Sequence, residues 1–170
     1  MRKLQILKTF IDVFWFASIL SGIIILFFVP YLFISDEKFD IPIKIYNKSI
    51  ILDNLASKII LTINVIAFYI FAFGVFKLRK LLELFRKTII FEEENCLLLK
   101  QIGICFLVAS LTSGISGFAY NIIGHSKMEL KFSTGFDSFL FTASIGLFFM
   151  VLSEVFKIAK KATNENELTI

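Results

Sequence analysis

The sequence predicts an all-α membrane protein, a bundle of four transmembrane helices with a small extracytoplasmic antiparallel β cap. Three observations predict it: four long apolar runs, an unusual composition and a bias in the positions of the basic residues. The chain is 57% hydrophobic and 16% aromatic, with a mean hydropathy of +0.82, well above the usual range of soluble domains. Four spans in 170 residues leave no room for a second domain, so we expect residues 1–170 to form one integral membrane domain.

Each apolar run is long enough to cross the hydrocarbon core of a bilayer as a helix, which takes about 20 residues at about 1.5 Å per residue. The runs cover 14–34, 59–76, 102–123 and 139–156. With their flanks they predict spans of about 11–34, 58–85, 94–124 and 137–160, and outer loops of about 35–57 and 125–136. The first run is too long for a signal peptide and no A-x-A-like cleavage site follows it, so we expect it to be retained.

Basic residues favour one side of the predicted bundle. Lys and Arg in short loops are held in the cytoplasm, and all three Arg and most of the Lys lie in the amino end, the middle connection and the tail. We therefore expect both termini to be cytoplasmic. The net charge of +4 is spread over three segments, so it predicts attraction to the lipid bilayer and no direct binding of nucleic acid.

The outer loops contain alternating patterns typical of half-buried strands. Apolar residues alternate with others over 39–46, and Asn47-Lys48 is a turn candidate before 49–52. Residues 128–132 alternate in the same way. These segments predict the antiparallel β cap on the outer ends of the helices.

A few polar residues lie inside the spans. Small residues at 110, 113, 114 and 117 favour close packing, which puts the third span at the centre of the bundle. A candidate intramembrane polar cluster lies at one depth and consists of Asn64, Ser116, Tyr120 and Thr142. Hydrogen bonds within the cluster would satisfy groups that lipid cannot. The alternative, a transport path, usually contains intramembrane charges, and none joins this set.

The middle connection has the most distinctive pattern. Residues 76–85 are amphipathic and extend the second span as a helix, and 88–91 break that pattern. Glu92, Glu93 and Glu94 then open the next helix, where carboxylates meet the positive end of the helix dipole. We predict a helical hairpin, against which the basic tail and Leu168-Thr169-Ile170 dock, with Leu168 burying against Phe91.

This connection and the C-terminus resemble two signatures of a bacterial membrane family, domain of unknown function 2975. The resemblance identifies a candidate interaction motif, with Ile89 and Ile90 standing where the family often has a turn former; the motif comprises Phe91, Glu94, Asn95, Leu99, Gly103, Glu165, Leu168, Thr169 and Ile170. It implies the cytoplasmic (inner) membrane of a bacterium and no assigned reaction. The family's genes often lie beside one for a small helix-turn-helix regulator, which implies a protein partner in the cytoplasm or membrane.

Catalytic and metal-binding patterns are missing from the sequence. It contains no G-x-S-x-G, H-E-x-x-H or Walker loop, and its one histidine is His125, so we expect no enzyme activity, catalytic residue, cofactor or metal. Cys96 and Cys105 would lie about 13 Å apart along one helix, too far for a disulfide. Asp12 and Glu154 have Lys8 and Lys157 on their own helix faces and predict ion pairs at the membrane interface.

Two functional hypotheses follow. The first is a non-enzymatic multi-pass membrane protein that senses a signal or binds a partner through its cytoplasmic hairpin and tail. The second is a small transporter or channel subunit in which the polar cluster lines a wet cavity. That alternative requires an oligomer, because four narrow helices rarely enclose a pore.

Overall fold

A computed structural model describes residues 2–34, 43–45, 48–50, 55–88, 90, 92–125 and 138–167. The helices in this part of the chain are α1 (Arg2–Ile34), α2 (Leu55–Arg86), α3 (Glu93–His125) and α4 (Phe139–Glu167). All four are long and apolar enough to cross a membrane, so the chain is a multi-pass membrane protein. At 29 to 33 residues they measure about 43 to 50 Å. They are therefore longer than a hydrocarbon core of about 30 Å and extend past the membrane.

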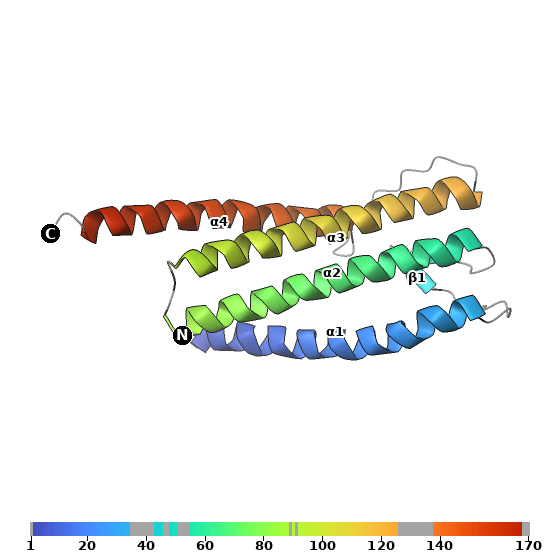
Figure 1. Ribbon diagram of the computed structural model, residues 1–170, viewed down its shortest axis with the longest axis horizontal. Helices are drawn as coiled ribbons and strands as arrows, with labels where there is room; N and C mark the ends of the chain where they lie inside the picture. The colour runs from blue at the N-terminus through green and yellow to red at the C-terminus, as the bar shows by residue number, and fades with distance from the viewer. Residues whose placement is uncertain are drawn as a thin grey trace.

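The helices lie side by side in chain order, each antiparallel to the next (Figure 1). Contacts are extensive between α1 and α2, α2 and α3, and α3 and α4. The third span was predicted to be central, and α3 does pack against both α2 and α4. The outer positions of the row belong to α1 and α4. We call the end with the start of α1, the α2–α3 connection and the end of α4 the hairpin end, and the opposite end the loop end.

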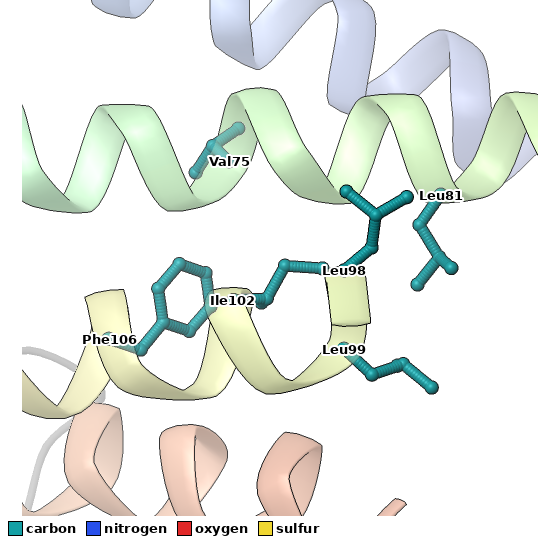
Figure 2. Close-up of a cluster of buried hydrophobic side chains, with 6 residues drawn as sticks. All are labelled: Val75, Leu81, Leu98, Leu99, Ile102 and Phe106. Atoms are coloured by element: carbon teal, nitrogen blue, oxygen red, sulfur yellow. The ribbon is translucent and has the colours of Figure 1, made fainter. Parts of the chain in front are cut away.

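The larger apolar core lies toward the hairpin end, between α2 and α3 (Figure 2). Leu99 and Ile102 are fully buried there. The rings of Phe71 and Phe106 stack at 4.9 Å between their centroids, and Phe85 of α2 stacks on Phe156 of α4 at 5.9 Å. Ile11 and Trp15 of α1 also pack against this core, so it joins all four helices. A smaller cluster at the loop end contains Leu32, Ile60, Leu61 and Tyr120.

The backbones of α3 and α4 approach closely where two glycines meet. A Cβ added to Gly103 would lie 2.6 Å from the carbonyl oxygen of Gly146, and one added to Gly146 would lie 2.9 Å from that of Gly103. Both distances are shorter than real Cβ contacts, so neither site can hold a side chain without movement of the backbone. Among the small residues expected to pack closely, Gly114 faces the ring of Phe139 and Ser110 is buried.

The predicted extracytoplasmic β cap is not supported. Two strands of three residues, β1 (Ile43–Ile45) and β2 (Lys48–Ile50), pair antiparallel with Ile43 opposite Ile50. A two-stranded pair is only marginally stable unless a third strand or a helix covers it. The segment predicted to join it, residues 128–132, lies outside the described residues, so the alternating pattern supports a short strand pair and no larger sheet.

Candidate interaction site at the hairpin end

The second helix ends in a tight turn at the hairpin end. The amide of Lys87 donates to the carbonyl oxygens of Glu83 and Leu84, and the amide of Thr88 donates to that of Phe85 at 3.1 Å. Thr88 has a φ of 63°, the left-handed conformation that closes many helices and that usually belongs to glycine. The chain therefore leaves α2 through a strained β-branched residue.

The third helix begins with a buried side chain. The carbonyl oxygen of Glu92 accepts hydrogen bonds from the amides of Asn95 and Cys96, and Glu93 and Glu94 occupy the first turn. Asn95 is fully buried, and its Nδ2 donates to the carbonyl oxygen of Ile90 at 2.8 Å. An amide side chain at this position therefore ties the start of α3 to the chain that leads into it.

A buried hydrogen bond joins the same turn to α4. The hydroxyl of Ser153 donates to the carbonyl oxygen of Cys96 at 2.7 Å, and the two residues are only 1% and 2% exposed. Sequence reasoning missed Ser153, because a single serine in an apolar run has no distinguishing pattern. The only available signal was its spacing, three residues before the buried-face aromatic Phe156.

Two ion pairs cross between helices around this turn. Lys80 Nζ of α2 lies 2.7 Å from Glu94 Oε1, and Lys160 Nζ of α4 lies 3.8 Å from Glu93 Oε2. One cation of the basic tail, Lys160, therefore meets the acidic turn, whereas Lys157 and Lys161 pair with Glu154 and Glu165 on their own helix. The predicted contact of Leu168 with Phe91 lies outside the described residues.

The fourth helix continues past this contact. It runs seven residues beyond Lys160 to Glu167, about 10 Å at 1.5 Å per residue, and extends beyond the other helices at this end of the bundle (Figure 1). Residues 161–165 are exposed, and Lys161 pairs with Glu165 at 3.8 Å. We call residues 161–167 the α4 extension.

The residues of the candidate interaction motif divide into two groups. Asn95, Leu99 and Gly103 lie in the interior, where they hold α3 against its neighbours. Glu94 and Glu165 are exposed and are accessible to another protein. The motif residues Phe91, Leu168, Thr169 and Ile170 lie outside the described residues.

The predicted intramembrane cluster forms in part. Asn64 Nδ2 donates to Ser116 Oγ at 2.7 Å and to the carbonyl oxygen of Ile60 at 2.9 Å. Tyr120 packs in the loop-end apolar cluster. In the described part of the chain, no side-chain hydrogen bond joins Thr142 to Asn64 or Ser116. The pair that forms links α2 to α3.

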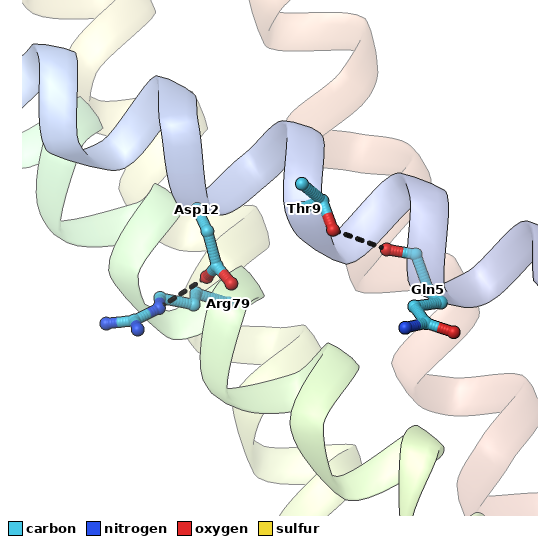
Figure 3. A network of polar contacts seen from close by, with 4 residues as sticks. All are labelled: Gln5, Thr9, Asp12 and Arg79. Carbon is cyan, nitrogen blue, oxygen red and sulfur yellow. Dashed lines mark hydrogen bonds and ion pairs between the residues drawn. The ribbon is translucent and has the colours of Figure 1, made fainter.

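The two predicted interface carboxylates differ. Glu154 pairs with Lys157 at 3.2 Å, as expected. Asp12 instead pairs with Arg79 of α2, at 2.5 Å between Oδ1 and Nε (Figure 3). The prediction of Lys8 as its partner was wrong, because spacing along one helix cannot indicate which residue a neighbouring helix presents.

Comparison with family models gives one match: the model described as protein of unknown function (DUF2975) matches residues 12–170. The match covers both signatures on which the resemblance was based. Comparison with curated proteins and with solved structures gives no match.

Proposed function

The chain belongs to the family described as protein of unknown function (DUF2975), and on that basis we propose that it is a non-enzymatic membrane component that binds a cytoplasmic protein partner through its hairpin end. We further propose that this end faces the cytoplasm of a bacterial inner membrane. The support is the concentration of Lys and Arg at that end and at both termini.

The observation that carries the proposal is the contrast between a fixed start of α3 and an exposed end of α4. The start of α3 is held by the buried Asn95 and by the Ser153 hydrogen bond to Cys96. The α4 extension projects past it and exposes residues 161–165. A helix already formed before binding loses little conformational entropy when a partner contacts it, so the extension suits protein recognition.

Site-specific photo-crosslinking tests the proposal in living cells. A photoreactive residue replaces Asn164, which is exposed in the α4 extension; the matched control replaces Phe148, which is 61% exposed within the membrane span of the same helix. We expect Asn164 to crosslink to one soluble protein and Phe148 to crosslink to none. The resemblance implies that a gene for a small helix-turn-helix regulator lies beside the gene for this chain, so that regulator is the first candidate to test. If Asn164 captures only lipid or other copies of the chain, the proposal fails.

Removing residues 165–170 provides a second test. The deletion should abolish the crosslink at Asn164 while the four spans remain folded. It also tests the predicted docking of the tail: protease cleavage of the α2–α3 connection should become faster. Unchanged cleavage would exclude the docking without affecting the partner hypothesis.

The transporter or channel alternative has less support. Asn64 is its central residue, and both polar hydrogens of its amide have acceptors in Ser116 and Ile60, as expected for packing. Ion flux across reconstituted vesicles separates the two hypotheses. Flux that Asn64→Ala abolishes would favour transport, and the absence of flux in the native protein would exclude it.

A further inference from the structure

Aromatic rings from α1 and α2 form a continuous row near the hairpin end. The Trp15 ring lies 5.7 Å from that of Phe76, and the Phe76 ring lies 6.4 Å from that of Phe73, between centroids. Phe73 is 52% exposed and Phe76 is 38% exposed. Phe73 and Phe76 therefore face outward, whereas Trp15 also packs against the apolar core. We call the three rings the aromatic row.

A cation lies over each end of this row. Lys77 Nζ is 5.0 Å from the centroid of Phe73, and Arg79 Cζ is 4.8 Å from that of Trp15. Both distances fall within the range of cation–π contacts. Each cation is therefore held against a ring at one end of the row, and the rings and cations together form one surface near the hairpin end.

Both cations retain hydrogen-bond donors for another acceptor. Within the described residues no carboxylate lies within 4.0 Å of Lys77, whereas Lys80, Lys87, Lys157, Lys160 and Lys161 each pair with one. Arg79 uses Nε for Asp12, and its terminal nitrogens point away from that carboxylate (Figure 3). With Asp12 included, the surface still carries one net positive charge.

Its place in the sequence puts this surface at the boundary of the apolar runs, where lipid headgroups are expected. Lys77 is the first charged residue after the apolar run of α2, and Asp12 lies two residues before that of α1. Tryptophan is typical of this boundary. A phosphate beside these cations would therefore have its acyl chains next to Phe73, an exposed apolar residue one turn deeper.

We propose that Lys77 and Arg79, at the two ends of the aromatic row, each bind the phosphate of an anionic phospholipid, with the acyl chains packed along the rings. A planar guanidinium can bind two phosphate oxygens at once, and the Lys77 ammonium provides a second positive charge. An anionic headgroup is favoured over phosphatidylcholine because the latter brings its own cation. Free inorganic phosphate shares the binding chemistry but has no chains to cover Phe73 and Phe76.

Trp15 is the only tryptophan in the sequence, so its fluorescence reports the lipid at this surface. The full chain is reconstituted in bilayers of phosphatidylglycerol and phosphatidylcholine at equal amounts, with bromine on the acyl chains of one lipid or of the other. We expect brominated phosphatidylglycerol to quench Trp15 more strongly, with a relative affinity for this lipid at least about three-fold higher, near 0.7 kcal/mol by RT ln K. Equal quenching by the two lipids would overturn the proposal.

Three variants and one competitor sharpen the result. Lys77→Gln should weaken the preference without disturbing α1, because Lys77 lies over the ring of Phe73 on its own helix and none of the described carboxylates pairs with it. Arg79→Gln should also weaken it, and Lys100→Gln, an exposed site on α3, should preserve it. If Lys100→Gln is as effective as Lys77→Gln, the attraction is general and no site exists. Inorganic phosphate at the same ionic strength as a chloride control should leave quenching unchanged; specific loss would identify a free-phosphate site and overturn the lipid assignment.

Discussion

The hydroxyl of Ser153 on α4 donates a hydrogen bond to the carbonyl oxygen of Cys96 in the first turn of α3, at 2.7 Å. The contact joins residues 57 positions apart in the sequence and both are buried. It fixes the position of α4 along its axis relative to the first turn of α3, which also contains Glu93 and Glu94.

Ser153→Ala should therefore destabilise the fold by about 1 kcal/mol, the typical net contribution of one buried hydrogen bond. Ser144→Ala is the matched control, because Ser144 lies exposed on the same helix and bonds only to the carbonyl oxygen of Leu140. Thermal denaturation of the detergent-solubilised protein measures both changes. Equal midpoints for the two variants would show that the interhelical bond contributes nothing.

Gly103→Ala should separate α3 from α4. Its Cβ would lie 2.6 Å from the carbonyl oxygen of Gly146 and 3.0 Å from the backbone nitrogen of Met150, so the backbone itself must move. Overpacking of this kind costs about 1 to 3 kcal/mol, against a gain of about 1 kcal/mol in helix propensity.

Gly22→Ala provides the comparison for this glycine. Its Cβ would meet an aromatic side-chain atom of Tyr69 at 3.2 Å, and a side chain can give way by a few tenths of an ångström. Denaturation in detergent should show Gly103→Ala clearly less stable than Gly22→Ala. The reverse order would mean that the close approach of the two helices is not a constraint.

Thr88→Gly should stabilise the protein by about 1 kcal/mol. The left-handed φ of 63° at Thr88 strains a β-branched residue and costs glycine nothing sterically. Thr163→Gly, inside the α4 extension, should instead lower stability slightly because glycine is a poor helix former. The same threonine-to-glycine change should therefore raise stability at residue 88 and lower it at residue 163. The shift in unfolding midpoint of each variant measures its effect. A loss of stability in Thr88→Gly would contradict the assigned turn.

The number and order of the helices were predictable from the sequence because hydrocarbon requires long apolar segments. The break after α2 was predictable too, since 88–91 interrupt an amphipathic pattern. The pairing of Asp12 with Arg79 was not, because it depends on how α1 and α2 are rotated about their axes. Spacing within one helix favoured Lys8, and an adjacent helix provided a guanidinium instead.

In the candidate site, too, some features were predictable from the sequence and others were not. Acidic residues before an apolar helix indicated the start of α3, and the basic tail indicated its partner, which the Lys160–Glu93 contact supports. The role of Gly103 was not predictable, because a glycine in an apolar run does not reveal which neighbour approaches it. The alternating patterns near residues 43–50 indicated the strand pair β1–β2 but do not support a cap, because alternation in a short loop does not ensure a surface that covers both strands.

The ion pair between Lys160 and Glu93 should limit access to the buried thiol of Cys96. Lys160→Glu places two carboxylates where a pair stood at 3.8 Å, and the loss of a partly exposed pair is worth about 0.5 to 1 kcal/mol. Local opening at the start of α3 should then be about two- to five-fold more frequent. In a Cys105→Ala background, alkylation of Cys96 by a water-soluble maleimide should accelerate by that factor.

Two further variants distinguish this contact from a general effect of charge. Lys161→Glu makes the same substitution at a residue that pairs with Glu165 on its own helix, so the rate of alkylation should stay near that of the native protein. Combining Lys160→Glu with Glu93→Lys restores opposite charges but puts a cation at the positive end of the helix dipole, so rescue should be partial. If Lys161→Glu accelerates alkylation as much as Lys160→Glu does, the tail does not hold this turn through Glu93.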